Sequence, residues 1–262
     1  MGLVASIAAV LAIGAAGAGA GGPPAPGCFD RPLTIEGTNR GDTIVGTEGP
    51  DVIETHGGRD VVDGRGGGDR ICTGSGRDNV TGGAGDDMII GGDAHDKLVG
   101  DFRDATGEIG QDLVLGDDGE DLVVGDILSS GDASGGANDT VEGGNRDDMV
   151  IGDSMSTEGD ATGAADDTVA GSDHNDKLVG DSLAAGKAWG KGGKDELIGG
   201  QRNDVLWGDH RGNETDGGPD ELTGGGGSDR FVAGPKKDRC EGGAGRDRDK
   251  SEPPCEKTIS IP

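Results

Sequence analysis

Aspartate recurs along this chain at a spacing of nine residues, each time after a glycine-rich stretch. Gly82–Val99 reads GGAGDDMII then GGDAHDKLV, two copies of the pattern Gly-Gly-x-x-x-Asp-x-(large apolar)-x. Asp87 and Asp96 hold the sixth place of these copies, and Ile89 and Leu98 hold the eighth. Carboxylates beside many backbone carbonyls form a set of hard oxygen donors, which Ca²⁺ prefers. The spacing therefore indicates an array of cation sites.

The repeat extends through most of the chain. Registering every nonapeptide on its sixth-place aspartate gives 19 repeats, at Asp42, Asp51, Asp60, Asp69, Asp78, Asp87, Asp96, Asp112, Asp121, Asp139, Asp148, Asp167, Asp176, Asp195, Asp204, Asp220, Asp229, Asp238 and Asp247. The eighth place is apolar in the first 17 of them: Ile44, Ile53, Val62, Ile71, Val80, Ile89, Leu98, Val114, Val123, Val141, Val150, Val169, Leu178, Leu197, Leu206, Leu222 and Phe231. Chance does not produce so many consecutive matches.

The nonapeptide predicts a specific coil. Glycine in the first six places favours a tight turn, because it adopts positive φ and lets backbones approach closely. Places seven to nine predict a three-residue strand whose middle side chain points inward. Two nonapeptides form one coil, and stacked coils form two parallel sheets across a thin apolar seam. The predicted fold is all-β, a parallel β-roll (a two-sheet β-solenoid) of about 19 half-coils with insertions on one edge.

Five intervals between aspartates exceed nine residues: Asp96 to Asp112, Asp121 to Asp139, Asp148 to Asp167, Asp176 to Asp195, and Asp204 to Asp220. They enlarge the turns of repeats 8, 10, 12, 14 and 16, and all even turns of a two-sided roll lie on one edge. We therefore expect the insertions to stack as a ledge along that edge. Each enlarged turn opens Gly-Asp, at Asp101, Asp126, Asp153, Asp181 and Asp209.

An outer apolar row accompanies the ledge. It consists of the residue before each enlarged turn: Val99, Val124, Ile151, Val179 and Trp207. Four of the insertions also carry an apolar residue near their start: Phe102, Leu128, Met155 and Leu183. Two interpretations follow: the inserted loops fold back and cover the row, or the row is an exposed stripe that binds a partner.

The composition points to the same chemistry. The chain has 262 residues with 58 Gly, no Tyr, and 51 acidic against 23 basic residues, a net charge of −28. So little apolar bulk and so much charge are typical of disorder unless the charge is neutralised. A nucleic-acid partner is excluded because no basic stripe exists. Multivalent cations are the natural counter-charge.

The two ends differ from the repeats. Residues 1–20 are apolar and small and end Ala18-Gly19-Ala20, which predicts a signal peptide despite the absence of a basic start. The alternative, a membrane anchor, is disfavoured because the run is too short for a span. Residues 21–36 form a lead-in and N-terminal cap with Ile35 in the seam, 37–250 the roll, and 251–262 a C-terminal capping tail. Repeats 18 and 19 are polar and degenerate, as the end of a solenoid requires.

Over about Gly37–Gly245 the chain resembles the RTX, or haemolysin-type, calcium-binding repeat proteins. The resemblance implies a parallel β-roll in which the sixth-place aspartates ligate Ca²⁺, with carbonyls of the first four turn places completing the shell. The metal ligands so implied are Asp42, Asp51, Asp60, Asp69, Asp78, Asp87, Asp96, Asp112, Asp121, Asp139, Asp148, Asp167, Asp176, Asp195, Asp204, Asp220 and Asp229. The motif is altered at its fourth place by Ala94, Arg146, His174 and Arg202. The gaps between turns limit the array to 17 ions, and we expect on the order of ten.

Four cysteines allow three pairings. Cys72 and Cys240 lie too many coils apart to bridge, and Cys28–Cys240 fails for the same reason. The remaining scheme, Cys28–Cys72 with Cys240–Cys255, staples each end of the roll and implies an oxidising compartment.

The sequence does not favour an enzyme. Its four histidines, His56, His95, His174 and His210, fall in separate repeats, and neither G-x-S-x-G nor H-E-x-x-H is present. We predict a secreted, extracellular protein that binds several Ca²⁺ and folds on binding, as a structural or interaction module without nucleic-acid partner or membrane span. One alternative is an adhesin or matrix protein that binds a surface or protein partner through the inserted loops. Another is a detached RTX tail of an exported hydrolase or toxin.

Overall fold

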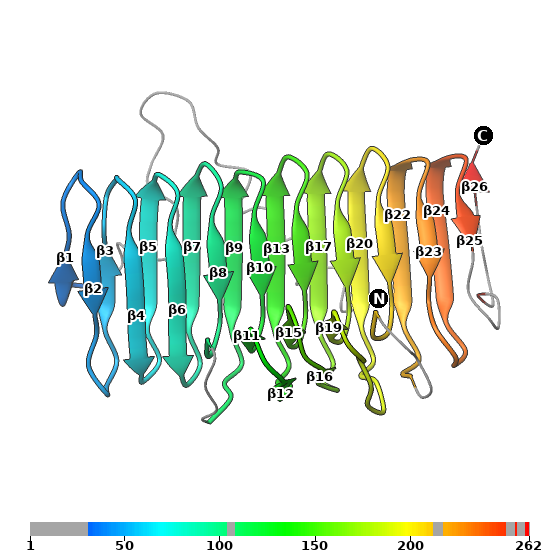
Figure 1. Ribbon diagram of the computed structural model, residues 1–262. Coiled ribbons are helices and arrows are strands. Elements are labelled where there is room, and N and C mark those ends of the chain that lie inside the picture. The colour runs from blue at the N-terminus through cyan, green and yellow to red at the C-terminus, as the bar shows by residue number, and fades with distance from the viewer. Residues whose placement is uncertain (1–30, 104–107, 212–216, 250–254, 256–259, 262) are drawn as a thin grey trace.

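A computed structural model describes residues 31–103, 108–211, 217–249, 255 and 260–261. The strands of this part of the chain form two long parallel sheets that run the length of a roll (Figure 1). Each strand pairs with the strand one coil away, so that successive coils stack in register. The predicted parallel β-roll is confirmed. The described residues contain no helix with the length and apolar character that crossing a membrane requires.

Sheet A has 11 strands and sheet B has 10. In spatial order, sheet A contains β1 (Ile35–Glu36), β3 (Val52–Glu54), β5 (Arg70–Ser75), β7 (Met88–Asp93), β9 (Leu113–Asp118), β13 (Thr140–Asn145), β17 (Thr168–Asp173), β20 (Glu196–Gln201), β22 (Glu221–Gly227), β24 (Arg239–Gly245) and β26 (Ser260–Ile261). Sheet B contains β2 (Thr43–Val45), β4 (Val61–Gly66), β6 (Asn79–Ala84), β8 (Lys97–Val99), β10 (Leu122–Val124), β14 (Met149–Ile151), β18 (Lys177–Val179), β21 (Val205–Trp207), β23 (Arg230–Val232) and β25 (Arg248–Asp249).

The seam between the sheets is the predicted one. All 17 apolar eighth-place residues are buried in a single cluster, and none is more than 9% exposed. Ile35 of β1 packs against this cluster and pairs with Ile53 of β3, so the strand predicted at the N-terminal end of the roll is present. Each half-coil thus contributes one seam side chain, and a coil buries it only against its neighbours.

Strand length departs from the prediction. Only the strands before the enlarged turns (β8, β10, β14, β18 and β21), β2, β3 and β23 have three residues, whereas β4 to β7, β9, β13, β17 and β20 have six. The prediction failed because the chain stays paired through the first glycines of the next turn, as where Gly92 pairs with Gly74. Gly74 has a φ of 85° and Gly92 of 107°, so glycine permits a conformation that other residues rarely adopt. Where an insertion follows, as after β8 and β10, the strand ends before these glycines and keeps three residues.

The inserted loops form two small parallel sheets beside the roll, visible along its lower edge in Figure 1. One consists of β11 (Leu128–Ser129), β15 (Met155–Ser156) and β19 (Leu183–Ala184), the other of β12 (Ala133–Ser134) and β16 (Ala161–Thr162). The predicted ledge is therefore an ordered layer, stacked loop on loop.

The ledge covers the outer apolar row. Val99, Val124, Ile151 and Val179 are at most 1% exposed and cluster with Leu128, Leu183 and Met155 of the loops. Trp207 packs at the edge of this cluster, with the Arg211 guanidinium 4.5 Å from its ring centroid. The covering interpretation is confirmed, and the exposed stripe is wrong for those four buried residues, because the loops bring their own apolar side chains over them.

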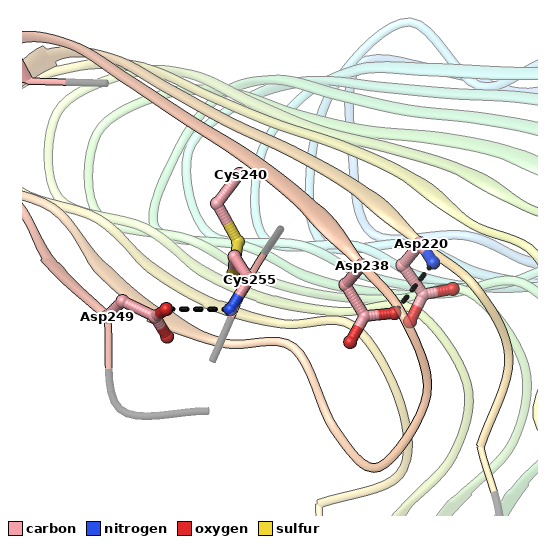
Figure 2. Close-up of a disulfide and its surroundings, with 5 residues drawn as sticks. All are labelled: Asp220, Asp238, Cys240, Asp249 and Cys255. Atoms are coloured by element: carbon pink, nitrogen blue, oxygen red, sulfur yellow. Dashed lines mark hydrogen bonds between the residues drawn. A yellow bond between two sulfur atoms is a disulfide. The ribbon is translucent and has the colours of Figure 1, made fainter. Parts of the chain in front are cut away.

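The C-terminal end is closed by a disulfide. Cys240 lies in the seam position of β24 and is bonded to Cys255, with Cα atoms 5.7 Å apart (Figure 2). The backbone N–H of Cys255 donates to Asp249 Oδ2 at 2.8 Å, and β26 pairs beside β24. The last repeat, degenerate in sequence, still forms the two-residue strand β25.

The N-terminal predictions are tested only in part. Cys72 is disulfide-bonded. Its predicted partner Cys28, the signal peptide at residues 1–20 and most of the lead-in lie outside the described residues.

Candidate metal site

The sixth-place aspartates form two rows, one along each edge of the roll. The odd row runs from Asp42 to Asp247, and the even row runs from Asp51 to Asp238 along the edge with the ledge. In both rows the backbone N–H of each aspartate donates to Oδ1 of the aspartate in the next coil, at 2.7–3.0 Å and without a break. The enlarged turns all belong to the even row, as predicted.

This ladder of hydrogen bonds engages Oδ1 of each aspartate and leaves Oδ2 without a partner in most of them. Oδ2 is buried and has no hydrogen-bond partner in Asp60, Asp69, Asp78, Asp87, Asp96, Asp112, Asp121, Asp139, Asp148, Asp167, Asp176, Asp195, Asp204, Asp220 and Asp229. A buried ionised oxygen without a partner is strongly destabilising. Each of these atoms therefore requires a proton or a cation.

Glycine at the first place of the turn exposes Oδ2 to backbone carbonyls. A Cβ placed on Gly82 would lie 2.3 Å from Asp87 Oδ2 and 2.3 Å from the carbonyl oxygen of Gly100 in the next coil. A Cβ placed on Gly116 would likewise lie 2.6 Å from Asp121 Oδ2 and 2.3 Å from the Gly143 carbonyl oxygen. Carboxylate and carbonyl oxygens thus face one small space, and this donor set fits Ca²⁺.

No group of three or more His, Cys, Asp or Glu side chains in the described part of the chain is arranged to hold a metal ion. The oxygen atoms that face the space at one turn are row carboxylates and backbone carbonyls. The histidines are scattered as predicted. The ring of His210 is buried, which lowers its pKa to about 4, and its Nδ1 accepts a hydrogen bond from the Ser182 N–H at 3.2 Å.

Burial raises the pKa of many carboxyls in the middle of both rows. The pKa of Asp69 rises to about 6 and that of Asp96 to about 8, because desolvation outweighs the backbone hydrogen bond each accepts. For Asp139, burial and the neighbouring carboxylates Asp126 and Asp112 raise the pKa to about 11. In the folded roll Asp96 and Asp139 therefore stay protonated near pH 7 unless a cation stabilises their ionised form.

A family model for the RTX calcium-binding nonapeptide repeat (4 copies) matches residues 36–71, 73–102, 161–182, 189–210 and 214–249, more than half of the chain. The chain belongs to this family. A search of curated proteins finds no match to it. The RTX roll also continues through residues 108–160, which the family model does not match, where β9, β10, β13 and β14 keep the same pairing.

The first two turns of the RTX roll differ from the rest. Threonine replaces glycine at their second place, and Thr38 donates to Asp42 Oδ2 from its N–H at 2.6 Å and its hydroxyl at 2.9 Å. Thr47 does the same to Asp51 Oδ2 at 2.7 and 3.0 Å. These two carboxylates are already partnered by the protein. Burial alone would raise the pKa of Asp51, but the hydrogen bonds from Thr47 and Thr34 outweigh it and hold the pKa below its ordinary value.

The structure also reveals carboxylates that sequence analysis did not assign as ligands. The Gly-Asp residues that open the enlarged turns, Asp101, Asp126, Asp153, Asp181 and Asp209, are at most 1% exposed. Their regular place, two residues after the end of each strand that precedes an enlarged turn, was the signal in the sequence. They lie beside the even row, since Asp126 is a main electrostatic neighbour of Asp139 and Asp101 of Asp112.

The glycine contact gives a direct test. We expect Gly82→Ala to destabilise the calcium-loaded roll by about 1–3 kcal/mol, because the new methyl group would displace Asp87 Oδ2 and the Gly100 carbonyl. Gly49→Ala is the control, since a Cβ there meets nothing within 4 Å. Urea unfolding in saturating calcium, followed by circular dichroism, measures both. Equal unfolding midpoints for the two variants would contradict this account of the turn.

Proposed function

We propose that this protein is a secreted module that binds several Ca²⁺ ions in its Asp/Gly-rich turns and folds on binding. The observation that carries the proposal is the pair of aspartate rows, whose Oδ2 atoms from Asp60 to Asp229 are buried without partners against backbone carbonyls. Membership of the RTX calcium-binding repeat family supports the same ion. The net charge of −28 supplies a second, independent reason for a multivalent counter-ion.

The proposed ligands are the sixth-place aspartates from Asp42 to Asp229, with each ion between successive turns of one row. Oδ2 is the carboxylate atom offered to the ion, because Oδ1 already accepts the hydrogen bond of the ladder. Asp42 and Asp51 are the weakest ligands of the set, since a cation would compete there with threonine donors. On the order of ten ions remains our expectation.

Secretion is part of the proposal. The Cys240–Cys255 disulfide supports an oxidising compartment, since cytosolic proteins rarely keep such bonds. The apolar segment at residues 1–20 supports an N-terminal export signal. A chain that folds only with calcium would then fold where calcium is abundant.

An adhesin or matrix role is the second candidate. Trp189 of the ledge is 54% exposed, which favours contact with a surface or protein partner through the inserted loops. A pull-down in calcium, comparing the wild type with a variant whose insertions are cut to six-residue turns, separates this role from a purely structural one. If the trimmed variant still captures the partner, the inserted loops are not the binding surface.

We expect Asp78→Asn to reduce the calcium stoichiometry of the roll, because Asp78 flanks two gaps of the odd row and its Oδ2 has no protein partner. Asp63→Asn is the matched control, since Asp63 is an exposed residue of β4 outside both rows. Titration calorimetry of the oxidised, full-length chain counts the ions. A wild type that binds no calcium, or equal losses in the two variants, would contradict the proposed ligands.

A further inference from the structure

A third row of carboxylates lies inside the ledge. It consists of Asp101, Asp126, Asp153, Asp181 and Asp209, here the loop row, with one residue from each enlarged turn. The backbones of its members also stack, since Asp101 N–H donates to the Asp126 carbonyl at 3.2 Å and Asp126 N–H to the Asp153 carbonyl at 3.3 Å. The loop row runs parallel to the even row but uses a different place in the turn.

Four members of the loop row are held by their own loops. Their Oδ1 atoms each accept one backbone N–H from the end of the same inserted loop: Gly110 to Asp101 at 3.0 Å, Ala137 to Asp126 at 3.1 Å, Gly193 to Asp181 at 2.8 Å, and Gly218 to Asp209 at 2.6 Å. Oδ2 of Asp101, Asp126 and Asp181 is buried with no hydrogen-bond partner. One oxygen thus fixes the carboxylate, and the other points into the row.

Asp153, at the centre of the row, is the exception. It is 0% exposed, and neither Oδ1 nor Oδ2 has a hydrogen-bond partner. The charged groups that act most strongly on it are four other carboxylates, those of Asp167, Asp126, Asp181 and Asp195. The side chains near enough to share a proton with it, those of Asp126 and Asp181, are themselves carboxyls, so Asp153 has no positively charged partner in the row.

Glycines close the space around Asp153. A Cβ on Gly136 would lie 2.4 Å from Asp153 Oδ1, and one on Gly163 would lie 2.5 Å from Asp153 Cβ and 2.5 Å from the Gly135 carbonyl oxygen. Backbone therefore approaches the carboxylate as closely as it does in the nonapeptide turns. The neighbourhood again combines carboxylate with carbonyl oxygen.

Electrostatics agree with this geometry. Burial raises the pKa of Asp126 to about 9 and that of Asp181 to about 8, and mutual repulsion adds to both shifts. His210 adjoins the far end of the row, with Nδ1 3.9 Å from Asp181 Oδ2, but burial keeps its imidazole neutral near pH 7. It does not neutralise the row.

We propose that the loop row is an additional file of Ca²⁺ sites, with ions held between successive aspartates and centred on Asp153. Two carboxylates flank each gap, and no third side chain converges there among the described residues, so loop carbonyls would complete the shell. Such an irregular oxygen shell suits Ca²⁺ better than Mg²⁺, which demands near-ideal octahedral geometry. The ions would bind each inserted loop to the next and so hold the ledge in order.

Counting ions tests the proposal. The five aspartates of the loop row leave four gaps, of which Asp153 borders two and Asp101 borders one. Native mass spectrometry of the oxidised, full-length protein in calcium should show a loss of two ions in Asp153→Asn and of one ion in Asp101→Asn. Glu158→Gln is the control, because Glu158 is exposed in the same loop as Asp153 and undergoes the same change of charge.

The outcomes are separable from those for the nonapeptide turns. Unchanged ion counts in both Asp153→Asn and Asp101→Asn would overturn the loop-row sites. If the wild type still binds calcium in that case, the nonapeptide sites are unaffected by the result. An equal loss in Glu158→Gln also overturns them, since net charge would then explain the loss. If Asp153→Asn does not fold in calcium, Asp101→Asn decides alone, because it removes only the end of the row and its amide oxygen can still accept from Gly110 N–H.

Discussion

Removing calcium is expected to unfold most of the roll, and restoring it at up to millimolar concentration to refold it. Far-UV circular dichroism should show a largely disordered chain in chelator and a β-rich spectrum in calcium. The effect should be close to all-or-none along the array, because each coil is stable only against its neighbours.

The physical reason is the thinness of the core. Each nine-residue half-coil buries one seam side chain, such as Val80 or Ile89, between the sheets. That single residue must offset the ordering of a whole half-coil, which includes a glycine-rich turn of high conformational freedom. In the same half-coil a carboxylate is buried within its row, as Asp87 is at 3% exposure. Without a cation, each added coil therefore adds repulsion and unsatisfied oxygen atoms.

The control separates ion binding from charge screening. Sodium chloride at about 0.15 M screens exposed charges beyond about 8 Å, but it should not restore the β spectrum, because the row carboxylates are buried. Magnesium should restore it less well than calcium, since carbonyl-rich turns fit its octahedral demands poorly. Identical spectra in chelator and in calcium would contradict the proposal that calcium drives folding.

The period of the sequence predicts most of this architecture. The nine-residue register alone places Ile53, Ile71 and Ile89 one above another in sheet A, and the pairing confirms it. The parity of the insertions predicts their common edge, because even turns of a two-sided coil cannot lie anywhere else. These features follow from the fixed repeat of the chain, which leaves few other ways to bury one apolar residue per repeat.

Features that depend on atoms outside the repeat were not predicted. The threonine donors at Thr38 and Thr47 look like ordinary substitutions until the Asp42 and Asp51 carboxylates are placed beside them. The burial of Asp153 depends on the return path of its loop, and the insertions share neither length nor period. The strand extension through Gly92 depends on pairing with the neighbouring coil, which local turn chemistry does not reveal.

The calcium-free chain should gain structure as the pH falls. Burial, opposed by a backbone hydrogen bond, raises the pKa of Asp87 and of Asp96 to about 8 in the folded roll, against 3.8 ordinarily. A carboxyl whose folded pKa is raised binds its proton more tightly in the folded state, so protonation favours folding. That contribution is fully present below about pH 4 and is lost as the pH rises through about 8. Acidification of the calcium-stripped protein from pH 8 to 5 should therefore increase its β-sheet signal.

In calcium the pH dependence should reverse. A ligand carboxylate must be ionised, so protons compete with the ion, and calcium affinity should fall as the pH falls through the same window. Binding near pH 5, where the acidified calcium-free chain has gained structure, should release protons, because carboxyls such as Asp148, whose pKa burial raises to about 9 in the folded roll, must lose theirs. Titration calorimetry in buffers of different ionisation enthalpy measures the number released.

Both arms need a check on aggregation, because the isoelectric point of the chain is about 4.2. Light scattering at each pH, with the acid series ended at pH 5, keeps association apart from folding. Calcium binding at pH 5 without proton release, together with a calcium-free spectrum that does not change with pH, would mean that the rows are ionised before any ion arrives. The roll would then have to tolerate stacked buried carboxylates without neutralisation, and calcium would add order to a fold that already exists.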